Sequence, residues 1–154
     1  MKSTKVFKID TDEYVDYYYK VYWCQTICCG FPNLLCCCCV HSNLTDFANS
    51  VTVTVTDNEL KYEREKIKTC WRLSCCDAGR IEKNIAIKRI IDVALIEPAG
   101  GIPPETLYRV KIQTASNSGV NLPELKIVGL KKEDAEKLKK VLIKRRDNDV
   151  MDRV

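Results

Sequence analysis

Hydrophobic and polar residues alternate along much of the chain from residue 50 onward, and this pattern predicts β-strands. Residues 51–56, VTVTVT, alternate strictly and place Val51, Val53 and Val55 on one face of a half-buried strand. Asp57 and Asn58 then form a turn signal that predicts a hairpin with the next strand. Further strands are predicted at 59–67, 69–76, 80–87, 90–97, 106–114 and 124–129.

The hydrophobic period changes to that of a helix after residue 130. Ala135, Leu138, Val141 and Leu142 form one stripe, which predicts an amphipathic helix from Lys131 to Arg146. Acidic residues in its first turn and basic residues in its last turn complement the helix dipole. We therefore predict a mostly β fold with a C-terminal α-helix: a curled antiparallel barrel of about seven strands, of the pleckstrin-homology type.

The first 46 residues have a different pattern and are expected to form an aromatic- and Cys-rich N-terminal segment that associates with a membrane. Residues 11–23, TDEYVDYYYKVYW, contain five tyrosines and a tryptophan. Tyr and Trp beside an apolar stretch are typical of a membrane interface. An aromatic-rich strand or helix packed on the following domain explains the same residues, and both interpretations stand at this point.

No Asp, Glu, Lys or Arg occurs between Lys20 and Asp46. The length of this gap raises the question of a transmembrane helix. Gly30, Pro32 and Asn33 interrupt its middle, so two short apolar runs around a turn fit a re-entrant or interfacial hairpin better than one straight span.

Composition and charge add limits to this picture. The chain has 154 residues and a formal net charge of +4, which suits one domain with an appended segment and gives no basis for nucleic-acid binding. We place the domain at residues 50–146 and a tail at 147–154. The start MKSTKVFKID has no apolar core of a secretory signal, and Lys2 excludes N-myristoylation.

Seven of the ten cysteines lie in the N-terminal segment, and we expect S-acylation there because adjacent thiols beside apolar residues suit membrane-bound acyltransferases. Two or more acyl chains make membrane attachment stable. The lipidation candidates are Cys24, Cys28, Cys29, Cys36, Cys37, Cys38 and Cys39. Without a secretory signal, disulfides are not expected.

A metal site is the alternative for the same cysteines. Neighbouring residues of an extended strand point to opposite faces, so the run from Cys36 to Cys39 cannot all reach one ion. A set made of Cys24, Cys28, Cys36 and Cys39 remains open. His41 is expected to be an exposed polar residue, and Cys70, Cys75 and Cys76 are expected to be buried apolar residues.

Three segments of the chain resemble the bacterial pleckstrin-homology domain, also called the membrane-flanked or YdbS-like domain. They are GRIEKNIAIKRIIDVALIEP, LYRVKIQTASNSG and LKIVGLKKEDAEKLKKVL, within residues 50–146. The matching positions are Ile87, Arg89, Ile90, Asp92 and Val93, and then Gly129, Glu133 and Asp134. Members of this family commonly follow transmembrane helices, so the resemblance implies a membrane location. Here the cysteine-rich segment occupies that place.

No catalytic motif is found, and we expect a non-enzymatic protein without cofactor or metal. We predict a membrane-associated binding or adaptor module at the cytoplasmic face, with a membrane surface carrying anionic lipids or a protein as its partner. Lys83, Lys88 and Arg89 are the candidate ligand-binding charges. We also assign Arg89, together with Asp92, a structural role: a charged pair can satisfy the backbone groups left exposed at a short crossing between two strands.

Two alternatives from other classes remain. One is a structural subunit of a larger assembly, in which the cysteine-rich segment is buried at an interface. The other is a small metal-binding protein.

Overall fold

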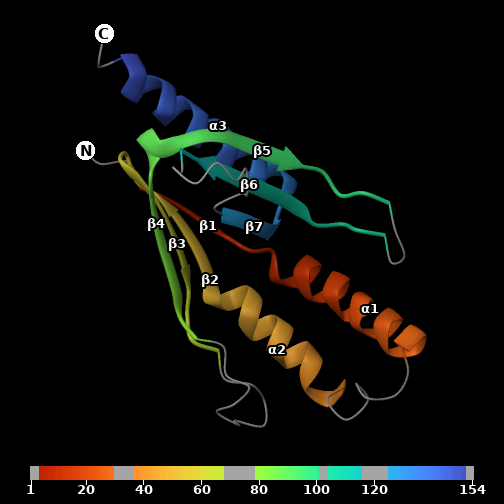
Figure 1. Cartoon of the computed structure of the whole chain (residues 1–154). Coiled ribbons are helices and arrows are strands. Elements are labelled where there is room, and N and C mark those ends of the chain that lie inside the picture. The colour runs from red at the N-terminus through yellow and green to blue at the C-terminus, as the bar shows by residue number, and fades with distance from the viewer. Residues whose placement is uncertain (1–3, 30–36, 68–78, 101–103, 116–124, 152–154) are drawn as a thin grey trace.

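A computed structural model of the chain describes residues 4–29, 37–67, 79–100, 104–115 and 125–151. Within these residues the fold is mixed α/β, with seven antiparallel strands in two sheets and three α-helices (Figure 1). The sequence analysis expected a mostly β fold with one helix, and this proportion is wrong. The difference lies before residue 50, where the aromatic and cysteine-rich residues form two helices.

The first sheet has the strand order β1-β2-β3-β4, and the sequence predicted three of its members. These strands are β1 (Lys5–Lys8), β2 (Val51–Val55), β3 (Glu59–Arg64) and β4 (Ile81–Ala86). The alternation expected in β2 is confirmed, because Val51, Val53 and Val55 are each at most 1% exposed.

Strand β1 was not predicted. It pairs antiparallel with β2, and Phe7 lies opposite Val53 and is buried in the same core. The N-terminal segment therefore contributes an edge strand to the sheet. The strand expected at 69–76 lies outside the described residues.

The second sheet has the order β5-β6-β7, with β5 at Ile90–Ile96, β6 at Tyr108–Thr114 and β7 at Leu125–Leu130. A 3-10 turn, η3 (Ile87–Arg89), connects it to β4. The register of β5 shifts between Ile90 and Asp92. Arg146 Nη1 donates a hydrogen bond to the Ile91 carbonyl oxygen at 2.8 Å, so a side chain from the C-terminal helix supports this irregular backbone. The sequence analysis had assigned such support to Arg89 and Asp92.

Helix α3 (Lys132–Met151) packs against η3, β5 and β6 and closes one side of the core. The expected apolar stripe is confirmed: Ala135, Leu138 and Leu142 are fully buried, and Val141 packs beside them. Both sheets and α3 contribute to this one cluster. The described strands form two separate sheets and do not close into a barrel.

Helices α1 (Thr11–Cys29) and α2 (Cys37–Ser50) occupy the connection between β1 and β2. They pack against each other and extend away from the sheets as a helical hairpin (Figure 1). The sequence predicted an interruption at Gly30, Pro32 and Asn33, between the two helices. Residues 30–36, which contain it, lie outside the described residues. Within the described residues, no helix combines the length and apolarity that crossing a bilayer requires.

Candidate functional site

The base of the helical hairpin is fixed to the body by Asp10 and Gly129. The backbone N–H of Asp10 donates to the Gly129 carbonyl oxygen at 2.8 Å. The Asp10 carbonyl oxygen accepts from the Tyr14 N–H at 3.0 Å, which begins α1. Gly129 has φ +91°, and a Cβ there would lie 2.7 Å from Tyr14 Cδ2. The absence of a side chain at Gly129 therefore lets α1 pack closely on β7.

Aromatic rings hold the two helices together just beyond this base. Tyr14 stacks on Phe47 of α2 with ring centroids 5.5 Å apart, and it contacts Tyr18 at 4.6 Å. The Arg64 guanidinium lies 5.6 Å from the centre of the Phe47 ring. Burial raises the pKa of Tyr14 well above its ordinary value, so its phenol stays neutral.

A second set of rings lies farther along the hairpin, and we call it the aromatic cluster: Tyr19, Tyr22, Trp23 and His41. The Trp23 ring centroid lies 6.1 Å from that of Tyr19 and 6.0 Å from that of Tyr22. Tyr19 also meets His41 of α2 at 6.0 Å. His41 is exposed, as expected, and the cluster brings it together with residues of α1. The sequence analysis missed this link because it depends on how α1 and α2 pair.

The far half of the hairpin carries no charged residue, and we call residues 21–29 and 37–45 the hairpin tip. The nearest charges on α1 are Lys20 and Asp16, an exposed ion pair at 2.6 Å. Ile27 lies within the tip, and its side chain is 79% exposed. The hairpin thus changes from charged at its base to uncharged at its tip.

The lipidation candidates lie on both helices of the hairpin tip and on the residues between them. Cys24 is a half-buried free thiol on α1. Cys39 on α2 is buried and disulfide-bonded, which differs from the expectation of free thiols. The side chains of Cys28, Cys29, Cys37 and Cys38, and the whole of Cys36, lie outside what the structure describes. S-acylation of this cluster stays a prediction.

Metal ligation finds no support in the described part of the chain. Among those residues there is no group of three or more His, Cys, Asp or Glu side chains placed to hold one ion. Cys70, Cys75 and Cys76, expected in the core, lie outside the described residues.

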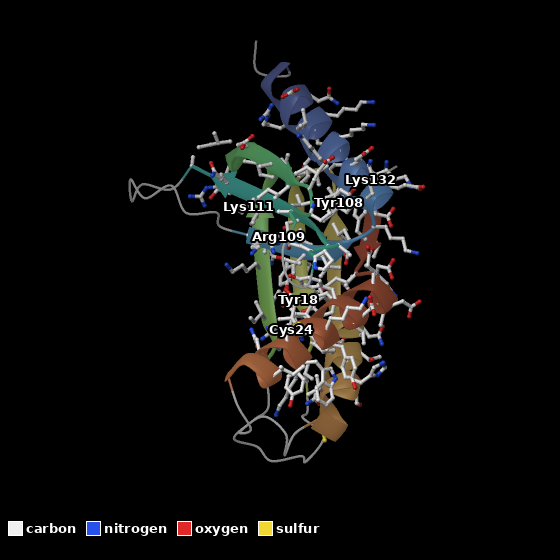
Figure 2. The ribbon with its side chains drawn as sticks, turned by 90° about the vertical axis from the view of Figure 1, so that its right-hand side faces the viewer. Tyr18, Cys24, Tyr108, Arg109, Lys111 and Lys132 are labelled. Carbon is white, nitrogen blue, oxygen red and sulfur yellow. The ribbon has the colours of Figure 1, made fainter. Side chains whose placement is uncertain are left out.

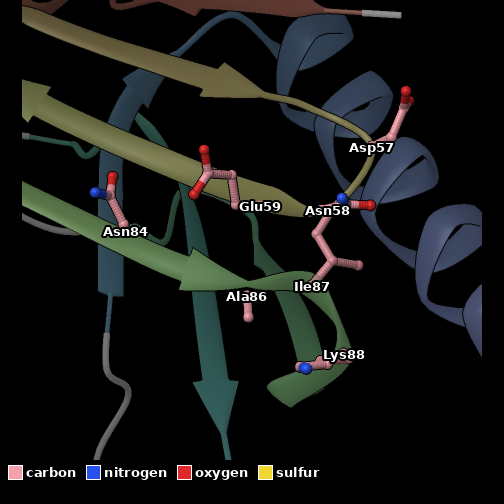
Figure 3. Close-up of a pocket in the computed structure, with 7 residues that line it drawn as sticks. All are labelled: Asp57, Asn58, Glu59, Asn84, Ala86, Ile87 and Lys88. Atoms are coloured by element: carbon pink, nitrogen blue, oxygen red, sulfur yellow. The ribbon is translucent and has the colours of Figure 1, made fainter. Parts of the chain in front are cut away.

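A pocket of about 550 Å³ lies where the turn between β2 and β3 meets β4 and η3 (Figure 3). Its described lining contains Lys88 together with the carboxylates of Asp57 and Glu59. The Asp57 carboxylate also lies 3.3 Å from Arg145 Nη2 of α3. Because Arg145 compensates Asp57, and Lys88 and Glu59 have opposite charges, the charges around the described lining balance and favour neither a cation nor an anion.

The three predicted ligand-binding charges are placed on two neighbouring elements. Lys83 is on β4 opposite Tyr62, while Lys88 and Arg89 end η3. All three are exposed, and of the three only Lys88 belongs to the described lining of the pocket. Their role in binding stays a prediction.

The sequence analysis also missed a group of cations on the second sheet. Arg109 and Lys111 alternate with buried Val110 and Ile112 along β6, and Lys126 lies on β7 directly opposite Lys111. The alternation was visible in the sequence, whereas the pairing of the two lysines depends on the register of the strands.

The chain matches no protein-family model, no curated protein and no solved structure.

Proposed function

We propose that this chain is a non-enzymatic, membrane-attached binding or adaptor module. Its hairpin tip enters one face of a membrane and carries acylated cysteines, and its body is a pleckstrin-homology-like domain held at the cytoplasmic surface. The observation that carries the proposal is the uncharged hairpin tip, which projects from a charged body and begins at an aromatic cluster.

The length of the tip favours insertion into one leaflet. From Val21 to Cys29 a helix rises about 12 Å at 1.5 Å per residue. The hydrocarbon layer of a bilayer is about 30 Å thick, so the described part of the tip is shorter than one leaflet. Insertion without crossing agrees with the helix lengths seen here.

The aromatic cluster supports a defined depth of insertion. Tyr19 and Trp23 lie one helical turn apart on α1, and His41 meets Tyr19 from α2. Rings with an apolar body and a polar tip concentrate at the level of lipid headgroups. The Lys20–Asp16 ion pair lies on the body side of this level, where water remains accessible.

Acylation of thiols in the tip would convert weak insertion into stable attachment. Each buried methylene contributes about 0.8 kcal/mol, and two acyl chains hold a protein stably. The exposed Ile27 side chain is next to the pair Cys28 and Cys29 in sequence, so early insertion of α1 would bring these residues to the membrane. Cys39 takes no acyl chain while it is in a disulfide.

The order of elements supports the pleckstrin-homology-like part of the proposal. Four antiparallel strands are followed by three, and a C-terminal helix packs on the second group. Strand β1 comes from outside residues 50–146, so within that range the described order is three strands, three strands and a helix. That order supports the resemblance of residues 50–146 to the bacterial domain. On this view the helical hairpin is an insertion between the first two strands. Lys83, Lys88 and Arg89 stay the proposed ligand-binding charges of the body.

Vesicle flotation of the chain purified without acyl groups tests the insertion. Ile27→Glu places a charge in the tip and should lower partition into phosphatidylcholine vesicles about tenfold or more. Ile91→Glu is the matched control, since Ile91 is 60% exposed on β5 of the body, and it should leave partition unchanged. Equal loss in both variants, with circular dichroism showing both folded, contradicts the proposal.

Acylation is tested separately in the cell that makes the protein. The intact mass of the protein should show added acyl chains. Hydroxylamine should remove these chains and should also release the protein from the membrane fraction. Replacing the cysteines of the tip by serine should have the same effect as hydroxylamine. If the protein in the membrane fraction has an unmodified mass, acylation is excluded. Whether the hairpin inserts is then decided by the flotation experiment alone.

The exposed apolar tip also supports the second candidate, a structural subunit whose tip is buried against another protein. Such a subunit stays in a stable complex in high salt and does not float with protein-free vesicles. A bound metal would appear in the same intact mass as a shift of its own.

A further inference from the structure

The outer face of the second sheet carries three cations in adjacent rows. Lys111 of β6 is paired in register with Lys126 of β7, and Arg109 lies two residues before Lys111 on the same face. The alternating residues Val110 and Ile112 point into the core and are fully buried. We call Arg109, Lys111 and Lys126 the basic strip.

The charges of the basic strip are incompletely compensated. Glu105 forms an ion pair with Arg109, yet the described residues show no ion pair or hydrogen bond of the Lys111 or Lys126 side chain. Burial lowers the pKa of Lys126, and the charges of Arg109 and Lys111 lower it further. Like charges at directly opposed strand positions destabilise a sheet. An anion placed over the two lysines would remove this repulsion.

The basic strip lies beside the base of the hairpin. Burial and Tyr17 raise the pKa of Tyr18 on α1, and the positive charge of Arg109 opposes that rise, so the charge of the strip acts on the base of α1. Figure 2 shows Lys111, Arg109, Tyr18 and Cys24 following one another from the second sheet down α1 toward the tip.

The distance along α1 from Tyr18 to the far end of the aromatic cluster is short. Trp23 lies about 8 Å beyond Tyr18 along the helix axis, at 1.5 Å per residue. The Debye length at physiological ionic strength is also about 8 Å. Lys111 lies two residues beyond Arg109 on β6, about 7 Å farther along the strand. With the aromatic cluster at headgroup level, Arg109 lies nearest the anionic headgroups, and the attraction is expected to weaken from Arg109 to the two lysines.

We propose that Arg109, Lys111 and Lys126 form a second membrane contact, a docking surface for anionic lipid headgroups next to the inserted hairpin. The inference rests on the proposed function, because hairpin insertion is what brings the strip to the bilayer. It assigns lipid recognition to the second sheet, whereas the residues predicted from the sequence are on β4 and η3. Charge complementarity and continuity with the hairpin select a lipid surface over a soluble anion.

Vesicle flotation with two compositions, phosphatidylcholine alone and with phosphatidylserine added, tests this contact. The unchanged chain should bind the anionic vesicles about tenfold more tightly at physiological salt. The double variant Lys111→Gln/Lys126→Gln should lose most of this additional affinity for anionic vesicles. Its affinity for phosphatidylcholine vesicles should not change. The matched control is Lys132→Gln/Lys140→Gln, which removes two exposed lysines of α3 and should keep the gain.

The outcomes separate this inference from the proposed function. The lipid-binding role of the basic strip is wrong if the unchanged chain binds both vesicle compositions equally, or if the two double variants lose equal affinity. Either result leaves hairpin insertion standing. Binding to anionic vesicles that needs the two lysines but tolerates Ile27→Glu overturns insertion, and it overturns with it the claim that insertion brings the basic strip to the bilayer. Binding to neither composition overturns both. Inhibition of anionic-vesicle binding by inorganic phosphate at constant ionic strength would identify a site for soluble phosphate and contradict the lipid assignment.

Discussion

Gly129 shows how one residue determines where the helical hairpin begins. Its φ of +91° lies in the region that favours glycine, and a Cβ would come within 2.7 Å of Tyr14 and 2.9 Å of Ile9. Gly129→Ala is expected to lower the free energy of unfolding by about 2 kcal/mol, since it combines backbone strain with displacement of Tyr14. Urea denaturation followed by circular dichroism measures the change.

Gly79 provides the control for that substitution. A Cβ at Gly79 would have no atom within 4 Å, and its φ is not in the left-handed region. Gly79→Ala should therefore leave stability nearly unchanged or raise it slightly. If the two variants lose equal stability, the close packing of α1 on β7 is not what Gly129 provides.

The single histidine and the tyrosines illustrate what residue type alone indicates. The sequence showed an aromatic-rich stretch beside an uncharged one, and both features are present in the hairpin. It left strand and helix open for the aromatic residues, because Tyr and Trp occur in both. The contact between Tyr19 and His41 could not be predicted, since it requires α2 to return along α1.

At the scale of elements, the pairing of β6 with β7 places Lys111 opposite Lys126, and two like charges at opposed positions are expected to destabilise the sheet. The pKa of Lys126 is lowered in the folded chain, so its charged form is disfavoured there. Stability therefore rises with pH as pH increases through the folded-state pKa toward the ordinary lysine value. Lys126→Gln should raise the free energy of unfolding at neutral pH by about 0.5 kcal/mol and remove this contribution to the alkaline rise.

Urea denaturation at neutral and alkaline pH measures both effects. Lys132→Gln, on the exposed face of α3, removes the same charge at a position outside the Lys111–Lys126 pair and serves as the control. A gain in stability of equal size in the control would show that reduced net charge, and not the Lys111–Lys126 pair, is responsible.

The strands and the last helix were largely predictable, because each has a clear period. Strict alternation identified β2, and the stripe through Ala135, Leu138 and Leu142 identified α3. Strand β1 was missed because four residues are too few to show a period. Its identity as a strand depends on pairing with β2 and on burial of Phe7.

At the scale of the whole molecule, two hydrophobic clusters connect the hairpin to the sheets. One contains the sheet residues and α3, and the other joins Tyr14 and Ala48 of the hairpin to Val51 and Leu107. Tyr62 packs against both clusters. This shared contact indicates that the base of the hairpin and the sheets unfold together.

Leu107→Ala tests that coupling, since Leu107 is 1% exposed within the hairpin cluster. It should lower the free energy of unfolding by about 3 kcal/mol and speed amide exchange in both the base of α1 and the sheets. Hydrogen exchange with mass spectrometry gives the regional rates. Ile91→Ala, at an exposed position, should change neither region, and exchange limited to α1 in Leu107→Ala would contradict a single cooperative unit.

The sequence by itself determined the periods of the strands and of α3, the uncharged and cysteine-rich character of the tip, and the break between its two runs. These are properties of neighbouring residues, so local patterns are enough to indicate them. Only the tertiary structure decided that β1 joins β2, that Tyr19 meets His41, and that Lys111 faces Lys126. Each of those contacts joins residues far apart in the chain, and strand register and helix packing, which form only on folding, bring them together.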